Sequence, residues 1–292
     1  MLRKRLVTDE QLNGLLATYC SQAAVFYQSA PPSQDKGWTG AQYPRMDYII
    51  DVAGDPARNV SMILVMNVWC DIETGVEPEP IEKRVHELLH TVLATPAGCS
   101  PYCFAWTRTD AFESSNVDQR QAQTYGVTIR FDILAFPILE ISEPDPMGAL
   151  AKWTKAAVPS ATVIGVDEMD EWTVPSADKP VLYWRMTARQ NSNHFHMGMW
   201  FDIVLAGHVI AQDAAARGAI VDELGVRMPM AKFALMGNKS PLHFSSVRAS
   251  PGADYLRVGQ IALSGRYVVL VHEDGEILNH VYFNGKEVPK YE

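Results

Sequence analysis

The chain has 292 residues, of which 47% are hydrophobic, and its 34 acidic and 25 basic side chains give a net charge of −9. This size allows one large domain or two ordinary ones, and the acidic balance disfavours a protein that holds nucleic acid through its phosphates. No apolar run is long enough to span a membrane and no signal-peptide core follows the first residues, so we expect a soluble protein that is not secreted.

The first predicted element is a long helix. Thr8 and Gln11 have the spacing of a capping box, and apolar side chains then recur at helical intervals as far as Phe26. Pro31 and Pro32 disfavour helical geometry before them, so the helix is expected to end by residue 30. Residues 33–42 lack any period and are expected to form an exposed loop.

A hairpin, a second helix and two more strands are predicted next. Alternating residues indicate antiparallel strands at 46–50 and 60–72. Acidic residues and prolines then precede a helix over 81–94, with a continuous apolar face. Further strands are expected at 104–112 and 125–136.

The same order of elements follows a second time. Residues 66–72 are echoed by residues 197–203, and both segments alternate as half-buried strands do. We therefore expect a tandem duplication that places Trp69 over Trp200 and Asp71 over Asp202. The predicted elements of the second half are a helix at 149–157, hairpin strands at 182–187 and 194–205 around a tip at 191–193, a helix from the cap Asp213 to Gly225, and strands at 232–236, 242–248, 256–271 and 277–283.

The predicted fold class is α+β, with two similar domains, each made of helices packed on a mostly antiparallel sheet. The first domain is assigned to residues 1–140 and the second to residues 147–292. An acidic stretch with prolines, typical of a domain boundary, separates them.

One motif has a mechanism behind it. His86, Glu87 and His90 form an HExxH pattern on a predicted helix, where two imidazoles one turn apart could hold zinc and the glutamate could deprotonate a bound water. A third ligand is needed, and Glu113 is the best candidate. The metzincin continuation is absent, and the matching helix of the second half has no histidine, so we expect two histidines beside an apolar stripe rather than a metal site.

The remaining candidates are weaker. His194 and His196 could ligate a metal from one side of a strand, but their neighbours suggest a solvated hairpin tip. Asp71 and Asp202 are interpreted as strand-end residues that hold turns. The cysteines, which have no CxxC spacing, are expected to be buried free thiols: Cys20, Cys70, Cys99 and Cys103. No catalytic, cofactor-binding or metal-binding residue is therefore assigned.

Several of these segments together resemble the tail terminator, or tail-completion, proteins of long-tailed bacteriophages. The segments are the leading helix that ends in Val25-Phe26, the Tyr43-Pro44-Arg45-Met46 entry to the hairpin, the Val68-Trp69-Cys70-Asp71 strand, the helix over 81–93, the Trp106-Thr107-Arg108-Thr109-Asp110 strand and the strand over 127–136. The resemblance covers residues 6–137 directly, and the second half only through the repeat.

The resemblance implies a structural virion protein without enzymatic activity. Such a protein forms a six-fold ring on the head-proximal end of the tail tube, stops tube polymerisation and joins the tube to the head connector. Its partners would be itself, the tail tube protein and the connector protein, while DNA passes the lumen without specific binding. It would be found at the neck of the virion tail, and in the host cytoplasm during assembly. This chain departs from the family in being double, so a hexamer or a trimer of double domains would close the ring. The alternatives are a zinc-dependent hydrolase built on His86 and His90, and another ring or baseplate component. Two loops, residues 33–42 and 167–178, are expected to reach out toward partners.

Overall fold

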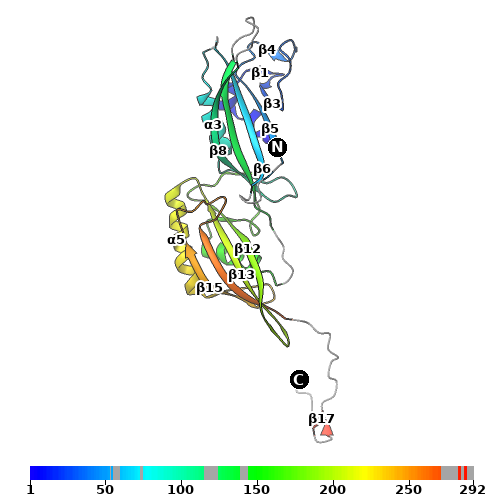
Figure 1. Ribbon diagram of the computed structural model, residues 1–292, viewed down its shortest axis with the longest axis vertical. Coiled ribbons are helices and arrows are strands. Elements are labelled where there is room, and N and C mark those ends of the chain that lie inside the picture. Colours follow the sequence, from blue (N-terminus) through cyan, green and yellow to red (C-terminus); the bar gives the residue numbers. More distant parts are fainter. Residues whose placement is uncertain are drawn as a thin grey trace.

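A computed structural model describes residues 1–52, 54, 60–72, 75–114, 124–138, 144–270, 282–283 and 286–287. Two lobes are stacked along the long axis of the molecule, each built on its own sheet of long strands (Figure 1). The mixed α+β class expected from the sequence is confirmed.

The first sheet has seven strands in the order β11-β7-β8-β9-β6-β5-β3. All neighbouring strands are antiparallel except β3 and β5, which run parallel. The strands of this sheet are β3 (Val25–Tyr27), β5 (Arg45–Asp51), β6 (Val60–Asp71), β7 (Leu93–Ala94), β8 (Tyr102–Ser114), β9 (Thr124–Ala135) and β11 (Trp172–Thr173). A separate small sheet contains β1 (Thr18–Tyr19), β2 (Gln22–Ala23) and β4 (Trp38–Thr39).

Helices α1 (Leu2–Val7), α2 (Glu10–Leu15) and α3 (Glu79–Leu89) cover one face of the first sheet. Strand β6 shows why, because Leu64, Met66 and Val68 are fully buried while the residues between them are half-exposed. This alternation commits one face of the sheet to the helices. The other face carries half-exposed side chains, among which those of Asn67 and Trp69 donate hydrogen bonds to Asp47.

The second sheet has six strands in the order β10-β12-β13-β16-β15-β14, and again only one pair, β10 and β12, is parallel. Helices α4 (Pro146–Ala157) and α5 (Ala214–Ala231) pack against one face of it. The strands are β10 (Thr162–Val163), β12 (Val181–Phe195), β13 (Gly198–Ile210), β14 (Phe233–Leu235), β15 (Pro241–Ala249) and β16 (Ile261–Leu270). Two short strands, β17 (Tyr282–Phe283) and β18 (Lys286–Glu287), pair with each other.

Six strands of the first sheet match the second sheet one for one. Reading from β7 to β3 and from β14 to β10 gives the same sequence of partners, with the parallel pair at the same edge and a long helix at the same point of the chain. Register supports the match. In the first sheet Met46 lies opposite Val68, in the second Leu182 lies opposite Val209, and all four side chains are buried.

The residue-by-residue alignment predicted from the heptapeptides is wrong. Trp69 is the third residue from the end of β6, ten residues before α3 begins, whereas Trp200 is the third residue of β13, beside the hairpin turn. In the matched registers the place of Trp69 is taken by Ile210. The heptapeptides resemble each other because both alternate as strands, and they occupy opposite ends of matching strands.

The predicted first helix is also wrong beyond Leu15. The true cap is Asp9, whose carboxylate accepts a hydrogen bond from the backbone N–H of Leu12 at 2.8 Å. After α2 the chain turns tightly through Cys20 and Ser21, both with positive φ, into strands β2 and β3. The apolar residues that fitted a helical period are therefore divided between helix α2 and the three short strands β1, β2 and β3.

Two boundaries in the second half differ from the prediction for a physical reason. Helix α5 continues past Gly225 to Ala231. Gly225 does not end the helix but permits it to pack closely on β15, since a Cβ at this position would lie only 2.9 Å from Ala249. The β12–β13 hairpin turns between Phe195 and Gly198, not at residues 191–193, and β14, β15 and β16 confirm the next three strands. The strand predicted at 277–283 lies largely outside the described residues.

The two lobes share a buried seam. Apolar side chains from the hairpin end of the first sheet meet side chains from the opposite end of the second sheet; they are Val60, Leu93, Cys103, Ala105, Leu134, Phe136, Ile164, Val181, Tyr183, Ile210 and Leu256. The Arg257 guanidinium pairs with the Asp132 carboxylate at 2.6 Å across the seam, and β11 from the second half adds to the first sheet. Burial of this size joins the lobes firmly.

Candidate functional site

The histidine motif lies at the carboxyl end of α3. His86 and His90 face each other with ring centroids 4.6 Å apart, and the Trp106 indole packs edge-on against His86 at 5.3 Å. The helix presents both rings on one side, because residues four apart are one turn apart. His86 and His90 are therefore neighbours in the structure, as their spacing in the sequence predicted.

The hydrogen bonding of His90 does not suit a zinc ligand. Its Nδ1 accepts a hydrogen bond from the backbone N–H of Trp106 at 3.1 Å, so the proton of the neutral ring is on Nε2. Zinc at Nε2 would have to displace that proton and leave an imidazolate. Burial, with the neighbouring charges of His86 and Arg217, lowers the pKa of His90 to about 4. The ring is thus kept neutral as a packed hydrogen-bond acceptor.

The other members of the supposed zinc site are committed elsewhere. Glu87 forms an ion pair with Arg84 at 2.9 Å, and Arg84 also bonds Asp9, which holds α2 against α3. Glu113 lies seven positions beyond Trp106 along β8, which at about 3.3 Å per residue puts it roughly 20 Å from His90. Within the described part of the chain, no three His, Cys, Asp or Glu side chains converge on a point where a metal could bind.

A polar cavity of about 250 Å³ lies beside the two histidines and is lined by His86, Glu87, His90, Thr91, Gln212 and Tyr255. Thr91 is its most unusual member, because it is β-branched yet has φ of 64° and is almost fully buried. Its backbone N–H bonds the Phe104 carbonyl at 2.9 Å, which ends α3 and brings the chain to β7. The strained residue is explained by this turn, and the cavity contains no activated nucleophile.

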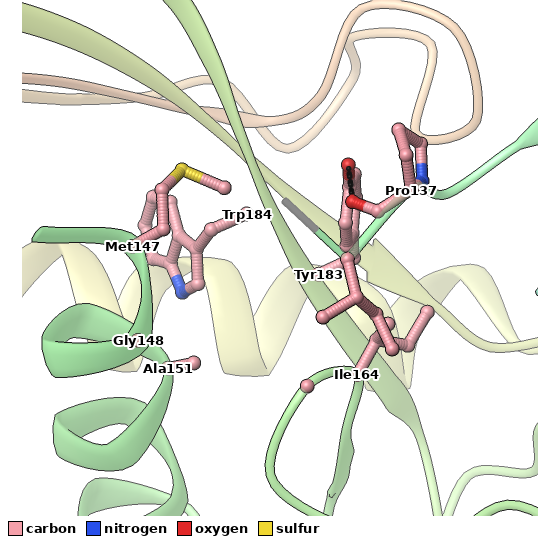
Figure 2. A pocket seen from close by; sticks show the side chains of 9 residues that line it. Pro137, Met147, Gly148, Ala151, Ile164, Tyr183 and Trp184 are labelled. Atoms are coloured by element: carbon pink, nitrogen blue, oxygen red, sulfur yellow. Dashed lines mark hydrogen bonds between the residues drawn. The ribbon is translucent and has the colours of Figure 1, made fainter. Parts of the chain in front are cut away.

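A second cavity lies where the linker between the lobes meets α4 and β12. Figure 2 shows Met147 and Trp184 on one side of it and Pro137, Ile164 and Tyr183 on the other. Its volume is only about 40 Å³, and its lining is mainly apolar. Ligand pockets are commonly about ten times larger, so this is a packing gap beneath the linker and not a substrate site.

The remaining candidate residues are separated from one another. His194 and His196 are exposed at the β12–β13 turn. Asp71 does end β6, but Asp202 lies inside β13, where its carboxylate accepts hydrogen bonds from Nε and Nη2 of Arg266 at 2.6 and 3.2 Å, so its assignment to a strand end is wrong. Of the cysteines, Cys70 and Cys103 are buried as expected, whereas Cys20 and Cys99 are exposed.

The sequence analysis missed the feature that projects furthest from the sheets. Strands β12 and β13 meet in a hairpin at the free end of the second sheet, where β13 pairs with β16 as far as Gly198 and β12 has no described partner on its outer side beyond Leu182 (Figure 1). A signal was available, because residues 181–201 contain no aspartate or glutamate in a chain with 34 of them.

No protein family, curated protein or solved structure was found to match the chain. No helix in the described ranges is both long and apolar enough to cross a bilayer.

Proposed function

We propose that the protein is a structural virion component that forms a ring at the head-proximal end of a phage or phage-like tail tube. The carrying observation is the arrangement of two sheets end to end with long strands whose outer edges have no described partner along most of their length. Such edges suit assembly by strand pairing or packing between subunits. The resemblance of residues 6–137 to tail terminator proteins gives this assembly its role.

We infer that the two lobes, residues 1–140 and 147–292, arose by tandem duplication. Matching strand orders, parallel pairs and helix positions support this. The failure of the heptapeptide alignment does not count against it, because topology is retained long after sequence registers diverge. A doubled protomer closes a ring of six lobes as a trimer, or builds a two-tier ring as a hexamer, which is the stoichiometry we favour.

The proposed partners follow from that place in the particle. One flat face of the ring binds the end of the tail tube, and the other meets the head connector at the neck. The net charge of −9 suits a lumen that DNA passes without being held, because acidic walls repel phosphates. Before assembly the protein would be present in the host cytoplasm.

Electron microscopy of the purified protein mixed with tail tubes tests the proposal. We expect closed rings that cap one end of each tube and tubes that stop growing. Discs within a baseplate would instead indicate another tail component. A stoichiometric zinc by emission spectrometry, lost in His90→Ala, would favour the hydrolase alternative, which the hydrogen bond to His90 Nδ1 disfavours. A protein that stays monomeric and ignores tubes would refute the proposal.

A further inference from the structure

The hairpin arm, defined as residues 187–199, projects from the second lobe. Every β12 residue from 187 to 195 is exposed, and its only described strand partner is β13. Its β13 strand pairs on the other side with β16, where Gly198 lies opposite Leu270, whereas the outer edge of β12 has no described partner beyond Leu182 and is open to pairing with another chain. The arm also exposes apolar side chains at its turn, with Phe195 42% and Met197 65% accessible. An open strand edge beside two neighbouring exposed apolar side chains is a surface that contact with another chain would bury.

The charge of the arm contrasts with that of the whole protein. Residues 187–199 contain one arginine, Arg189, two histidines and no acidic residue. The opposite end of the molecule is acidic, since residues 71–82, where β6 ends and α3 begins, contain five acidic residues and no basic one. Glu77 and Glu79 are exposed there, next to Ile72, which is 52% accessible. We call this region the acidic end. Opposite charge with exposed apolar groups on both sides makes the two ends complementary.

The seam within the chain shows how two such ends fit together. There, the hairpin end of the first sheet, with Val60 and Leu134, packs on the end of the second sheet where β12 begins and β13 finishes. In the second sheet, the hairpin end is the arm. In the first sheet, the end that corresponds to the buried end of the second sheet is the one where β5 begins and β6 finishes. This end adjoins the acidic end.

We propose that the hairpin arm of one copy docks on the acidic end of the first lobe of a second copy, and so repeats between chains the end-to-end packing that joins the lobes within a chain. This proposal deepens the self-assembly part of the proposed function and names its contact surface. The contact is head-to-tail, because the two surfaces differ and lie at opposite ends of the long axis (Figure 1). Such a contact closes into a ring where the rotation between copies closes, and because it joins the lobes in single file, the ring it gives is the trimer of double domains rather than the two-tier hexamer.

The character of the two surfaces fits a contact that forms after folding. The seam inside the chain is apolar, with Ile210 and Val181 fully buried. At the equivalent position in the first sheet, Trp69 is half-exposed and bonded to Asp47. A more polar patch keeps the free protein soluble, as in interfaces between chains that also exist apart.

Cross-linking of two single-cysteine variants tests the contact. In a background in which the exposed thiols are removed by Cys20→Ser and Cys99→Ser, one sample carries Met197→Cys on the arm and the other Glu77→Cys at the acidic end. A short bis-maleimide added to the mixture should give covalent dimers joined between positions 197 and 77, identified by peptide mass spectrometry. Each variant alone should stay monomeric on a denaturing gel.

Met230→Cys provides the matched control. Met230 is 75% exposed on α5, far from the arm in sequence, and should not cross-link to position 77. Cross-links of position 197 to itself, or equal cross-linking of position 230, or none at all, would overturn the proposed contact.

A second variant pair measures the effect on assembly. Met197→Asp should lower the assembled fraction at least tenfold in mass photometry, while Met230→Asp leaves it unchanged, and added salt should weaken assembly of the unaltered protein. Circular dichroism checks that both variants fold. Rings that cap tubes without the 197–77 cross-link would refute this contact and leave the proposed function standing. The cross-link without tube capping would do the reverse.

Discussion

The hairpin ends of the two sheets have the same place in the fold and opposite surroundings. In the first sheet this end is buried in the seam, where Val60, Leu134 and Phe136 are almost inaccessible. In the second sheet it is the hairpin arm, with Phe195 and Met197 exposed. One topology thus gives an end that joins the lobes and an end that is exposed, and the side chains at the strand ends decide which.

At one matching position, the interiors of the two sheets are filled by different pairs of facing side chains. Tyr48 lies opposite Met66 in the first sheet, and at the matching place Trp184 lies opposite Gly207 in the second. A Cβ on Gly207 would come within 2.7 Å of the Trp184 ring, so the larger ring is accommodated only because its neighbour has no side chain. One matching position is thus filled by two large side chains in the first sheet and by a single ring in the second.

The largest expected effect is on the seam. Phe136→Ala removes a fully buried ring that packs against Tyr183 at 5.0 Å and His208 at 5.8 Å, and should cost about 3–5 kcal/mol of unfolding free energy. Urea unfolding followed by tryptophan fluorescence measures it. Phe195→Ala on the arm is the control and should change the monomer's stability by less than about 0.5 kcal/mol. Equal losses would mean that the arm is already packed.

The second-largest expected effect is a loss of stability at the seam in acid. Burial lowers the pKa of His208 to about 4, and its Nδ1–H donates to the Tyr255 carbonyl at 3.0 Å while Nε2 has no partner. Arg185 and Asp254 are the charged groups that act on it, and their effects oppose each other. The pKa of His208 is about 6.5 in the unfolded chain and about 4 in the folded protein, so between these pH values the unfolded state binds the extra proton. Stability is therefore lost as the pH is lowered from 6.5 to 4, by up to about 3 kcal/mol.

Urea titrations at a series of pH values measure this loss. His208→Gln should flatten the curve between pH 6.5 and 4, whereas His194→Gln on the exposed turn should leave its shape unchanged. A curve that keeps its slope in His208→Gln would assign the acid sensitivity to other groups.

The close packing of the Trp184 ring on Gly207 can be tested by adding a methyl group at position 207. Gly207→Ala forces the added methyl against Trp184 and should destabilise the protein by about 1–3 kcal/mol. Gly14→Ala in α2 is the matched control, because nothing lies within 4 Å of its new Cβ, and it should stabilise by about 0.5–1 kcal/mol. Thermal unfolding of both variants against the unaltered protein gives the comparison, and opposite signs are expected.

The smallest effect concerns the buried indole of the second sheet. Trp184 Nε1 donates to Thr154 Oγ1 at 2.9 Å in the core, so Thr154→Val leaves a buried donor unpaired and should cost roughly 1–2 kcal/mol. In the first sheet Trp69 donates to Asp47 in a half-exposed place, where water can replace the acceptor. Asp47→Ala should therefore cost less than Thr154→Val, as measured by denaturant midpoints.

The sequence by itself determined the fold class and most of the long elements. Strands with strict alternation, such as β6 and β9, were predicted within about two residues, because a period of two commits one face to burial whatever the neighbours are. The pairing of His86 with His90 was also fixed locally, since both lie on one helix.

Tertiary structure decided what depends on partners distant in sequence. Whether residues 16–27 form a helix or strands was settled by the parallel pairing of Val25 with Met46, which outweighs a helical period. Whether the histidines form a metal site depended on the Trp106 amide, sixteen residues away, and whether Gly225 ends a helix depended on Ala249. The two sheet ends differ for the same reason: local alternation makes the strands, and only the surfaces brought against their ends determine which end is buried and which is left exposed.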